Sequence, residues 1–146
     1  MADLDSKYGP ELEKRLDAGE ELQGLCVASQ QKSRFKGGSV AIGVTDRRLL
    51  IQSLNWRGNP DGDPRSITRE QVDSVKAGPA GGEWINVDTA ILDYAAVRLE
   101  IRTTDGEQLK LMLMRAEGKL LGKLGGDEPQ RRGLEALASW FSDPGA

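Results

Sequence analysis

The sequence lacks histidine altogether and contains one cysteine, Cys26, and few aromatic residues (5%). Without histidine, the chain has neither the commonest general base nor the commonest metal ligand of proteins. One cysteine excludes an internal disulfide and any zinc site built from several cysteines. Because Ser-His-Asp and Cys-His arrangements are impossible and no pair of carboxylates stands out, we expect no enzyme activity, no cofactor and no metal.

Long apolar runs are also missing. The longest, such as Leu111–Met114, fall far short of the roughly 18 consecutive apolar residues of a membrane-spanning helix. The first residues, Met1–Lys7, show neither the basic region nor the apolar run of a signal peptide. The lone cysteine fits a reducing compartment. We therefore predict a cytoplasmic protein that is at most peripheral to a membrane.

The chain has no strong overall charge. Its formal net charge is −3, from 20 basic and 23 acidic side chains, so we expect no nucleic-acid partner. The average conceals a contrast along the chain, because residues 26–57 hold six basic side chains and one acidic one. We look first in this basic segment for a binding surface.

The residues that are present predict a single domain of helices and strands. Pro10 and Gly19 lie before and after the apolar i,i+4 pair Leu12 and Leu16, as at the start and end of a helix. Leu134, Leu137 and Phe141 fall on one face of a second helix. Between them, apolar and polar residues alternate as in strands. We predict one domain of residues 1–146, with an N-terminal helix at 10–18, about seven antiparallel strands within 22–115 and a C-terminal helix at 128–142.

Three shorter patterns refine this arrangement. Asp46 lies at the polar break between two strand-like runs and predicts a tight hairpin. Asp105-Gly106 predicts a hairpin with a two-residue type I′ turn. Ile85 alternates with polar neighbours within residues 84–92, which favours a strand there. Because seven strands in a flat sheet leave exposed edges, we predict a strongly bent sheet or barrel whose open end the last helix covers.

Several of these stretches match one family. They are the Leu-Asp-Ala-Gly-Glu-Glu-Leu run of Leu16–Leu22, the hairpin Ala41–Ile51, the segment Ile67–Val75, the strand pair across Asp105-Gly106, and the helix that ends in Trp140-Phe141. Over residues 16–141 the chain resembles the bacterial pleckstrin-homology-like (PH-like) domains, which are related to the GRAM and YokE-like domains. The resemblance implies a mainly β fold, a seven-stranded bent antiparallel barrel capped by a C-terminal helix. It also implies a binding or assembly role without catalytic residues.

A basic cluster lies in the link between the first two predicted strands. It consists of Lys32, Arg34 and Lys36, with Phe35 among them. Alternate residues of a strand share one face, so the three cations point the same way if the strand continues through them. Lipid-binding pleckstrin-homology domains hold phosphoinositide headgroups with Lys/Arg residues at this link. The cluster therefore has three interpretations: a solvated hairpin, a site for an acidic protein, or a site for anionic lipid.

Four further residues are candidates for the same surface. Arg47 and Arg48 belong to the family-like hairpin, where we expect one to point outward and the other to pair with a carboxylate. Trp56 and Arg57 begin a turn-rich loop, and an aromatic residue beside such a loop either anchors a partner or covers a barrel end.

These patterns predict a non-enzymatic binding or adaptor module. A protein partner is our first choice and anionic phospholipid the second. The alternative is a homo-oligomeric assembly protein that pairs barrel edge strands, with the alternating strand Val97–Ile101 or its neighbours as the edge. A small-molecule pocket at the barrel mouth is a third reading.

Overall fold

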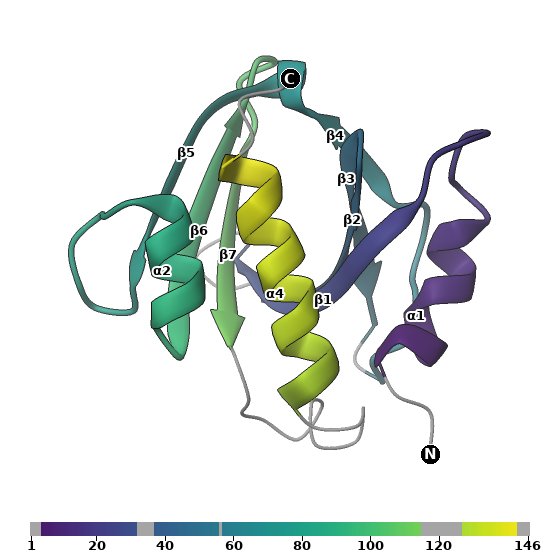
Figure 1. Cartoon of the computed structure of the whole chain (residues 1–146), viewed down its shortest axis with the longest axis horizontal. Helices are drawn as coiled ribbons and strands as arrows, with labels where there is room; N and C mark the ends of the chain where they lie inside the picture. Colours follow the sequence, from purple (N-terminus) through teal and green to yellow (C-terminus); the bar gives the residue numbers. More distant parts are fainter. Residues whose placement is uncertain (1–3, 32–36, 56, 115–126, 143–146) are drawn as a thin grey trace.

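A computed structural model describes residues 4–31, 37–55, 57–114 and 127–142 of the chain (Figure 1). Three helices and seven strands occupy these ranges, joined by one short 3₁₀ turn, η1. In chain order they are α1 (Leu4–Glu13), β1 (Leu22–Gln31), β2 (Gly37–Thr45), β3 (Arg48–Leu54), β4 (Arg65–Thr68), η1 (Arg69–Gln71), β5 (Val72–Pro79), α2 (Val87–Asp93), β6 (Ala96–Thr103), β7 (Gln108–Met114) and α4 (Asp127–Ser142).

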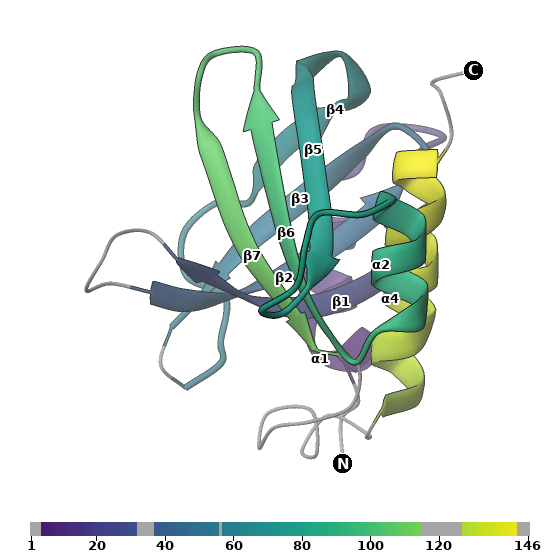
Figure 2. The ribbon, with the colours of Figure 1, turned by 90° about the vertical axis from the view of Figure 1, so that its left-hand side faces the viewer.

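The described strands form one antiparallel sheet in the order β4-β3-β2-β1-β7-β6-β5. β1 is shared by two halves: it pairs with β2 from Leu22 to Gln31, but with β7 only from Ala28 to Gln31. The sheet therefore bends at β1, and the two halves turn toward each other around α4 (Figure 2). The mainly β prediction with seven antiparallel strands and a covering C-terminal helix is confirmed.

The prediction of a barrel is wrong in one respect, because the sheet is bent but not closed. The two edge strands, β4 and β5, do not pair with each other. The free edge of β5 is instead occupied by Ile85, whose N–H donates to the Ala77 carbonyl at 2.8 Å. α2 also packs against β5. With this edge covered from within the chain, closure onto β4 is unnecessary for protecting the edge.

The core has two parts, one on each side of the sheet. The larger cluster lies inside the bend, where both half-sheets meet α2 and α4. The smaller cluster lies on the outer face of β1, β2 and β3, where α1 covers it with Tyr8 and Leu12, both fully buried. Period-two alternation along the strands separates the two clusters, because neighbouring residues point to opposite faces.

α4 lies directly on the backbone of β1, at a distance that only glycine permits. A Cβ added to Gly133 of α4 would overlap the Leu25 carbonyl, and one added to Gly24 of β1 would lie 2.6 Å from the Ala136 Cβ. The buried Gln130 side chain then completes the strand ladder beyond the point where β7 departs. Its Oε1 accepts from the Val27 N–H at 2.8 Å, and its Nε2 donates to the carbonyls of Val27 and Met114, both at 2.9 Å.

The N-terminal helix begins earlier than predicted, at Leu4–Glu13 rather than residues 10–18. The apolar face starts at Tyr8, one turn before Leu12, and the Tyr8 hydroxyl donates to the Gly58 carbonyl at 2.6 Å. After Leu12 the backbone hydrogen bonds change from the α-helical i→i−4 pattern to i→i−3, since the Arg15 N–H donates to the Leu12 carbonyl and not to that of residue 11. Tertiary anchoring at Tyr8 thus outweighs the local helix signals around Pro10.

Two other local predictions are wrong. The strand expected at residues 84–92 is the helix α2, because Ala90 and Ile91 are buried against the larger core cluster. The hairpin around Asp105 has a four-residue connection, not a two-residue type I′ turn. Gly106 has φ of +91°, and no described non-glycine residue has positive φ, whereas type I′ requires it at both central positions. The strands from Leu22 to Met114 and α4 at Asp127–Ser142 lie close to their predicted ranges.

The contact between α4 and β1 makes a direct stability prediction. Gly133→Ala should lower the free energy of unfolding by about 3 kcal/mol, because the new methyl group must displace the β1 backbone. Gly9→Ala is the matched control, since a Cβ at Gly9 in α1 meets nothing within 4 Å. The control should change the free energy of unfolding by less than about 1 kcal/mol, because the gain in helix propensity is opposed by the steric restriction on a residue that precedes Pro10. Urea denaturation of both variants measures the difference, and equal effects would contradict the packing we describe.

Candidate binding surface

The described residues leave the predicted basic cluster untested. Lys32, Arg34, Phe35 and Lys36 lie outside them, as does Trp56. The chain enters this link from Gln31 and leaves it at Gly37, and these two residues pair with each other.

The other predicted residues do not form one site. Arg47 and Arg48 lie at the start of β3 and Arg57 follows its end. The Arg47 side chain is 51% exposed and points outward, with its Nε 3.8 Å from the carboxylate of Asp46. Arg57 is exposed, and its backbone N–H donates to the Asn55 side chain at 2.9 Å. Arg48 is instead 18% exposed and paired, as expected of one arginine of this hairpin.

Arg48 forms a structural ion pair with the buried carboxylate of Glu20. Its Nε and Nη2 donate to the two carboxylate oxygens at 3.0 and 2.9 Å, a bidentate arrangement. The Thr45 hydroxyl donates to Glu20 at 2.7 Å, and the Asp17 N–H at 2.9 Å. Nη2 of Arg48 also donates to the Arg15 carbonyl at 2.7 Å. The cluster fixes the chain between α1 and β1 to the β2–β3 turn.

The same contacts set the protonation of Glu20. Burial by itself raises the pKa of this carboxyl, but the hydrogen bonds from Arg48, the Asp17 N–H and Thr45 outweigh burial and lower the pKa to about 2. A carboxyl whose pKa is lower in the folded than in the unfolded state stabilises the fold above the unfolded value. That contribution is lost as pH falls from about 4.5 toward 2, and its size is on the order of 3 kcal/mol.

Glu20→Gln should therefore destabilise the protein by about 3 kcal/mol at pH 7 and by progressively less as the pH is lowered toward 2. The pH dependence arises because Glu20 of the unfolded wild type binds a proton below about pH 4.5, which favours unfolding, whereas the amide of the variant does not titrate. Thermal or urea unfolding of both proteins between pH 2 and 7 measures the convergence. Glu21→Gln, at an exposed neighbouring side chain, serves as control. A stability difference that stays constant over this range would contradict the assignment.

A different surface gathers cations in the described residues, on the outer face of β5, β6 and β7. In β6, buried Val97, Leu99 and Ile101 alternate with outward-facing residues. Strand register places Glu100 between Lys76 of β5 and Lys110 of β7. Because alternate residues share a face, two arginines of β6 flank Glu100 on this side. We call the four cations of this surface the basic face: Lys76, Arg98, Arg102 and Lys110.

The basic face pairs with no carboxylate of the described residues. Glu100, at its centre, accepts a hydrogen bond from Gln108 at 2.7 Å and is within ion-pair distance of none of the four cations. Lys76, Arg102 and Lys110 are exposed. Within the described ranges, three of the four cations are therefore exposed and without a carboxylate partner, and their charge is available to a binding partner.

Trp84 joins the basic face through the loop between β5 and α2. The Arg98 guanidinium stacks on its ring at 4.4 Å and Lys76 lies 6.0 Å from the ring centre. Arg98 also donates to the Gly82 carbonyl, which ties the loop to β6. The loop approaches so closely that a Cβ on Gly78 would overlap the Glu83 carbonyl. Trp84 remains 40% exposed, so its ring both holds Arg98 and faces solvent.

The two outer faces of the bent sheet differ. α1 covers the face of β1–β3. In the described part of the chain no helix covers the basic face, since α2 and α4 both pack on the larger, inner core cluster (Figure 2). The sequence patterns do not predict this surface, although the alternating strand Val97–Ile101 is part of it. The missing information was the strand order, which brings Lys76 and Lys110 to the same place from distant parts of the chain.

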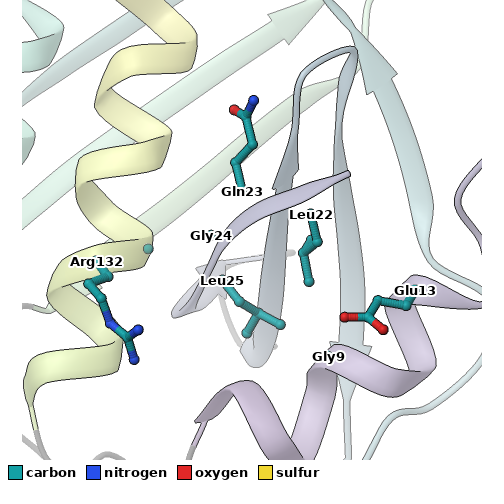
Figure 3. A pocket seen from close by; sticks show the side chains of 8 residues that line it. Gly9, Glu13, Leu22, Gln23, Gly24, Leu25 and Arg132 are labelled. Carbon is teal, nitrogen blue, oxygen red and sulfur yellow. The ribbon is translucent and has the colours of Figure 1, made fainter. Parts of the chain in front are cut away.

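A shallow cavity of about 220 Å³ lies where α1, β1 and α4 meet (Figure 3). Glu13 of α1 and Arg132 of α4 stand on opposite sides of it, and β1 forms its floor around Gly24. Gly24 and Gly133, the glycines of the contact between β1 and α4, both line the cavity.

Other chemistry is limited in the described residues. Burial raises the pKa of the Cys26 thiol to about 12, so this cysteine is a small apolar core residue and not a nucleophile. No group of three or more acidic or cysteine side chains is placed to hold a metal ion in the described ranges. None of the described helices has the length and apolar character that crossing a membrane requires.

Comparison with known proteins finds likeness in fold but not in sequence. No family model matches the chain, and no curated protein matches it. Among solved structures, it is similar to the hSac2 domain from human phosphoinositide phosphatase Sac2, with a TM-score of 0.50, 9% identity, and 92% of this chain and 73% of that chain covered. It is also similar to the C-terminal domain of an unknown protein from Leishmania infantum, with a TM-score of 0.49, 14% identity, and 95% and 94% covered.

Proposed function

We propose that the chain is a non-enzymatic, PH-like binding module that holds an acidic protein partner on its basic face. The observation that carries this proposal is the basic face itself, a set of cations without carboxylate partners on an outer sheet face that no described helix covers. Complementary charge on a partner speeds association and fixes its orientation, and it replaces the water that these cations lose on contact.

The PH-like part of the proposal rests on the motifs of residues 16–141 and on the strand order. A seven-stranded bent sheet with a covering C-terminal helix is the arrangement that the resemblance implies. The likeness to the hSac2 domain supports a shared fold, and at 9% identity it carries no activity or ligand over to this chain.

A protein partner fits the spacing of the cations better than a single lipid headgroup. Arg98 and Arg102 are four residues apart in one strand, which places them about 13 Å apart. Lys76 and Lys110 lie on strands either side of β6, about 10 Å apart. Cations at this spacing meet several anionic groups of an extended surface, whereas a phosphate site needs donors that converge on one group.

The sheet edges favour this reading over self-assembly. Of the predicted edge, Val97–Ile101 itself is not an edge, because β6 pairs with both β5 and β7, but its neighbour β5 is one. The true edges are β5, whose free side is bridged by Ile85, and β4, which is four residues long. Arg65 of β4 also pairs with Asp105 and Glu107 across the gap toward the β6–β7 hairpin. Short or covered edges are poor templates for pairing with a second copy.

The proposal predicts that removing the positive charges of the basic face weakens binding of the partner. The triple variant Lys76→Gln, Arg102→Gln and Lys110→Gln should lose the partner, with affinity lowered about tenfold or more, because three solvated cations no longer meet its acidic groups. The measurement is co-purification from the native host with quantitative mass spectrometry, followed by titration of the recovered partner. The matched control is Lys14→Gln, Arg47→Gln and Arg57→Gln, which removes three exposed cations from elsewhere on the surface.

The control also separates the two candidate surfaces. It removes Arg47 and Arg57, two of the residues that the sequence alone selected. Retention of the partner by the control and its loss from the basic-face variant support the proposal. Loss of the partner from the control and its retention by the basic-face variant would place binding at the predicted residues and refute binding at the basic face.

The covered edges predict a monomer. Light scattering after size exclusion should give the mass of one chain, 15.9 kDa, from about 10 to 300 μM. A dimer whose population rises with concentration would revive the assembly alternative, and hydrogen exchange at β4 and β5 would identify the edge that pairs.

A further inference from the structure

The basic face carries a selective feature beyond its charge, which is the carboxylate of Glu100 at its centre. Strand register sets Lys76 and Lys110 directly across from Glu100, and Arg98 and Arg102 lie two residues before and after it. The cations thus surround a fixed negative charge. An anionic group of a partner that lies directly above Glu100 meets its carboxylate, whereas one above either arginine of β6 meets no carboxylate, so the position above Glu100 is the less favourable one.

The spacing along β6 matches that of an extended peptide. Side chains on one face of a strand repeat every two residues, about 6.7 Å apart. A partner segment that runs along β6 with one acidic side chain above Arg98 therefore has its i+4 side chain above Arg102. Its i+2 side chain lies above Glu100, where a second carboxylate meets a like charge at closest range.

Arg98 gives this register a fixed reference. Its guanidinium is held by stacking on Trp84 at 4.4 Å and by its hydrogen bond to Gly82, so little side-chain freedom remains to be lost on binding. Gln108 holds the Glu100 carboxylate in the same way, at 2.7 Å. The side chains of Arg98 and Glu100 are therefore both held in place before a partner binds.

We propose, resting on the function proposed above, that the basic face selects an extended acidic protein segment with carboxylates at positions i and i+4 and an uncharged residue at i+2. Glu100 is the specificity residue. It lowers the affinity for acidic segments in general and by that means rejects those with the wrong spacing.

Two synthetic peptides of equal charge test this register. Both have nine residues with serine as background; one carries glutamates four positions apart, and the other carries them two positions apart. Titration of ¹⁵N-labelled full chain at low salt yields both the affinity and the amides that respond. The four-apart peptide should bind about threefold or more tightly, and the shifts should concentrate in β5, β6 and β7.

Glu100→Gln is the decisive variant, because its amide keeps an acceptor for Gln108 and removes only the charge. It should bring the ratio of the two affinities close to one, mainly by strengthening the two-apart peptide. Glu70→Gln, at an exposed acidic residue of η1, makes the same change in net charge and should leave the ratio unchanged.

The outcomes separate this inference from the function on which it rests. If both peptides bind the basic face equally in the wild type, the register is wrong while the acidic-partner function stands. If neither peptide binds, or the shifts map elsewhere, the inference fails, and retention of the native partner by the triple variant then refutes the function as well. Binding to phosphatidylserine vesicles that needs the basic face, without any peptide binding, would replace the protein segment by a membrane.

Discussion

The close contact between α4 and β1 is the constraint on which the rest of the structure depends. Gly133 and Gly24 let a helix lie on strand backbone, and Gln130 bonds to the Val27 peptide groups in place of a neighbouring strand. β7 therefore need not follow β1 along its whole length. The sheet is free to bend at Ala28, and both of its halves can enclose the same core cluster.

The bend gives the sheet two outer faces, of which one is covered by a helix and the other is exposed. One is apolar and buries Leu25, Val27 and Leu50 under α1. The other carries charged residues between the buried ones of β6 and stays open to solvent in the described part of the chain. A helix packs on the apolar outward-facing residues because burying their surface stabilises the fold. Charged outward positions remain available, which is why the proposed binding surface lies on β5–β7.

Arginines that look alike in the sequence have separate roles in this fold. Arg48 saturates a buried carboxylate and contributes to stability, whereas Arg47, its neighbour, points to solvent. Arg98 holds a loop through Trp84 and Gly82, and Arg102 is free of carboxylates in the described residues. Charge density along the chain therefore differs from charge density on the surface, because a guanidinium with a buried partner contributes little field outside.

Local patterns in the sequence were sufficient for β1, β2, β3, β6 and β7, the Asp46 turn, α4 and the mainly β class, since period-two and period-3.6 spacing are properties of neighbouring residues. They also predicted that one of the two hairpin arginines would pair. They failed at α1 and α2, where Tyr8 and Ile91 bond or pack with groups distant in the sequence. They also failed at the Asp105 turn, where the Asp105 carboxylate accepts hydrogen bonds from the Thr103 hydroxyl and the Glu107 N–H. The openness of the sheet and the basic face were decided only by tertiary structure, because strand order brings Lys76, Glu100 and Lys110 together from separate strands.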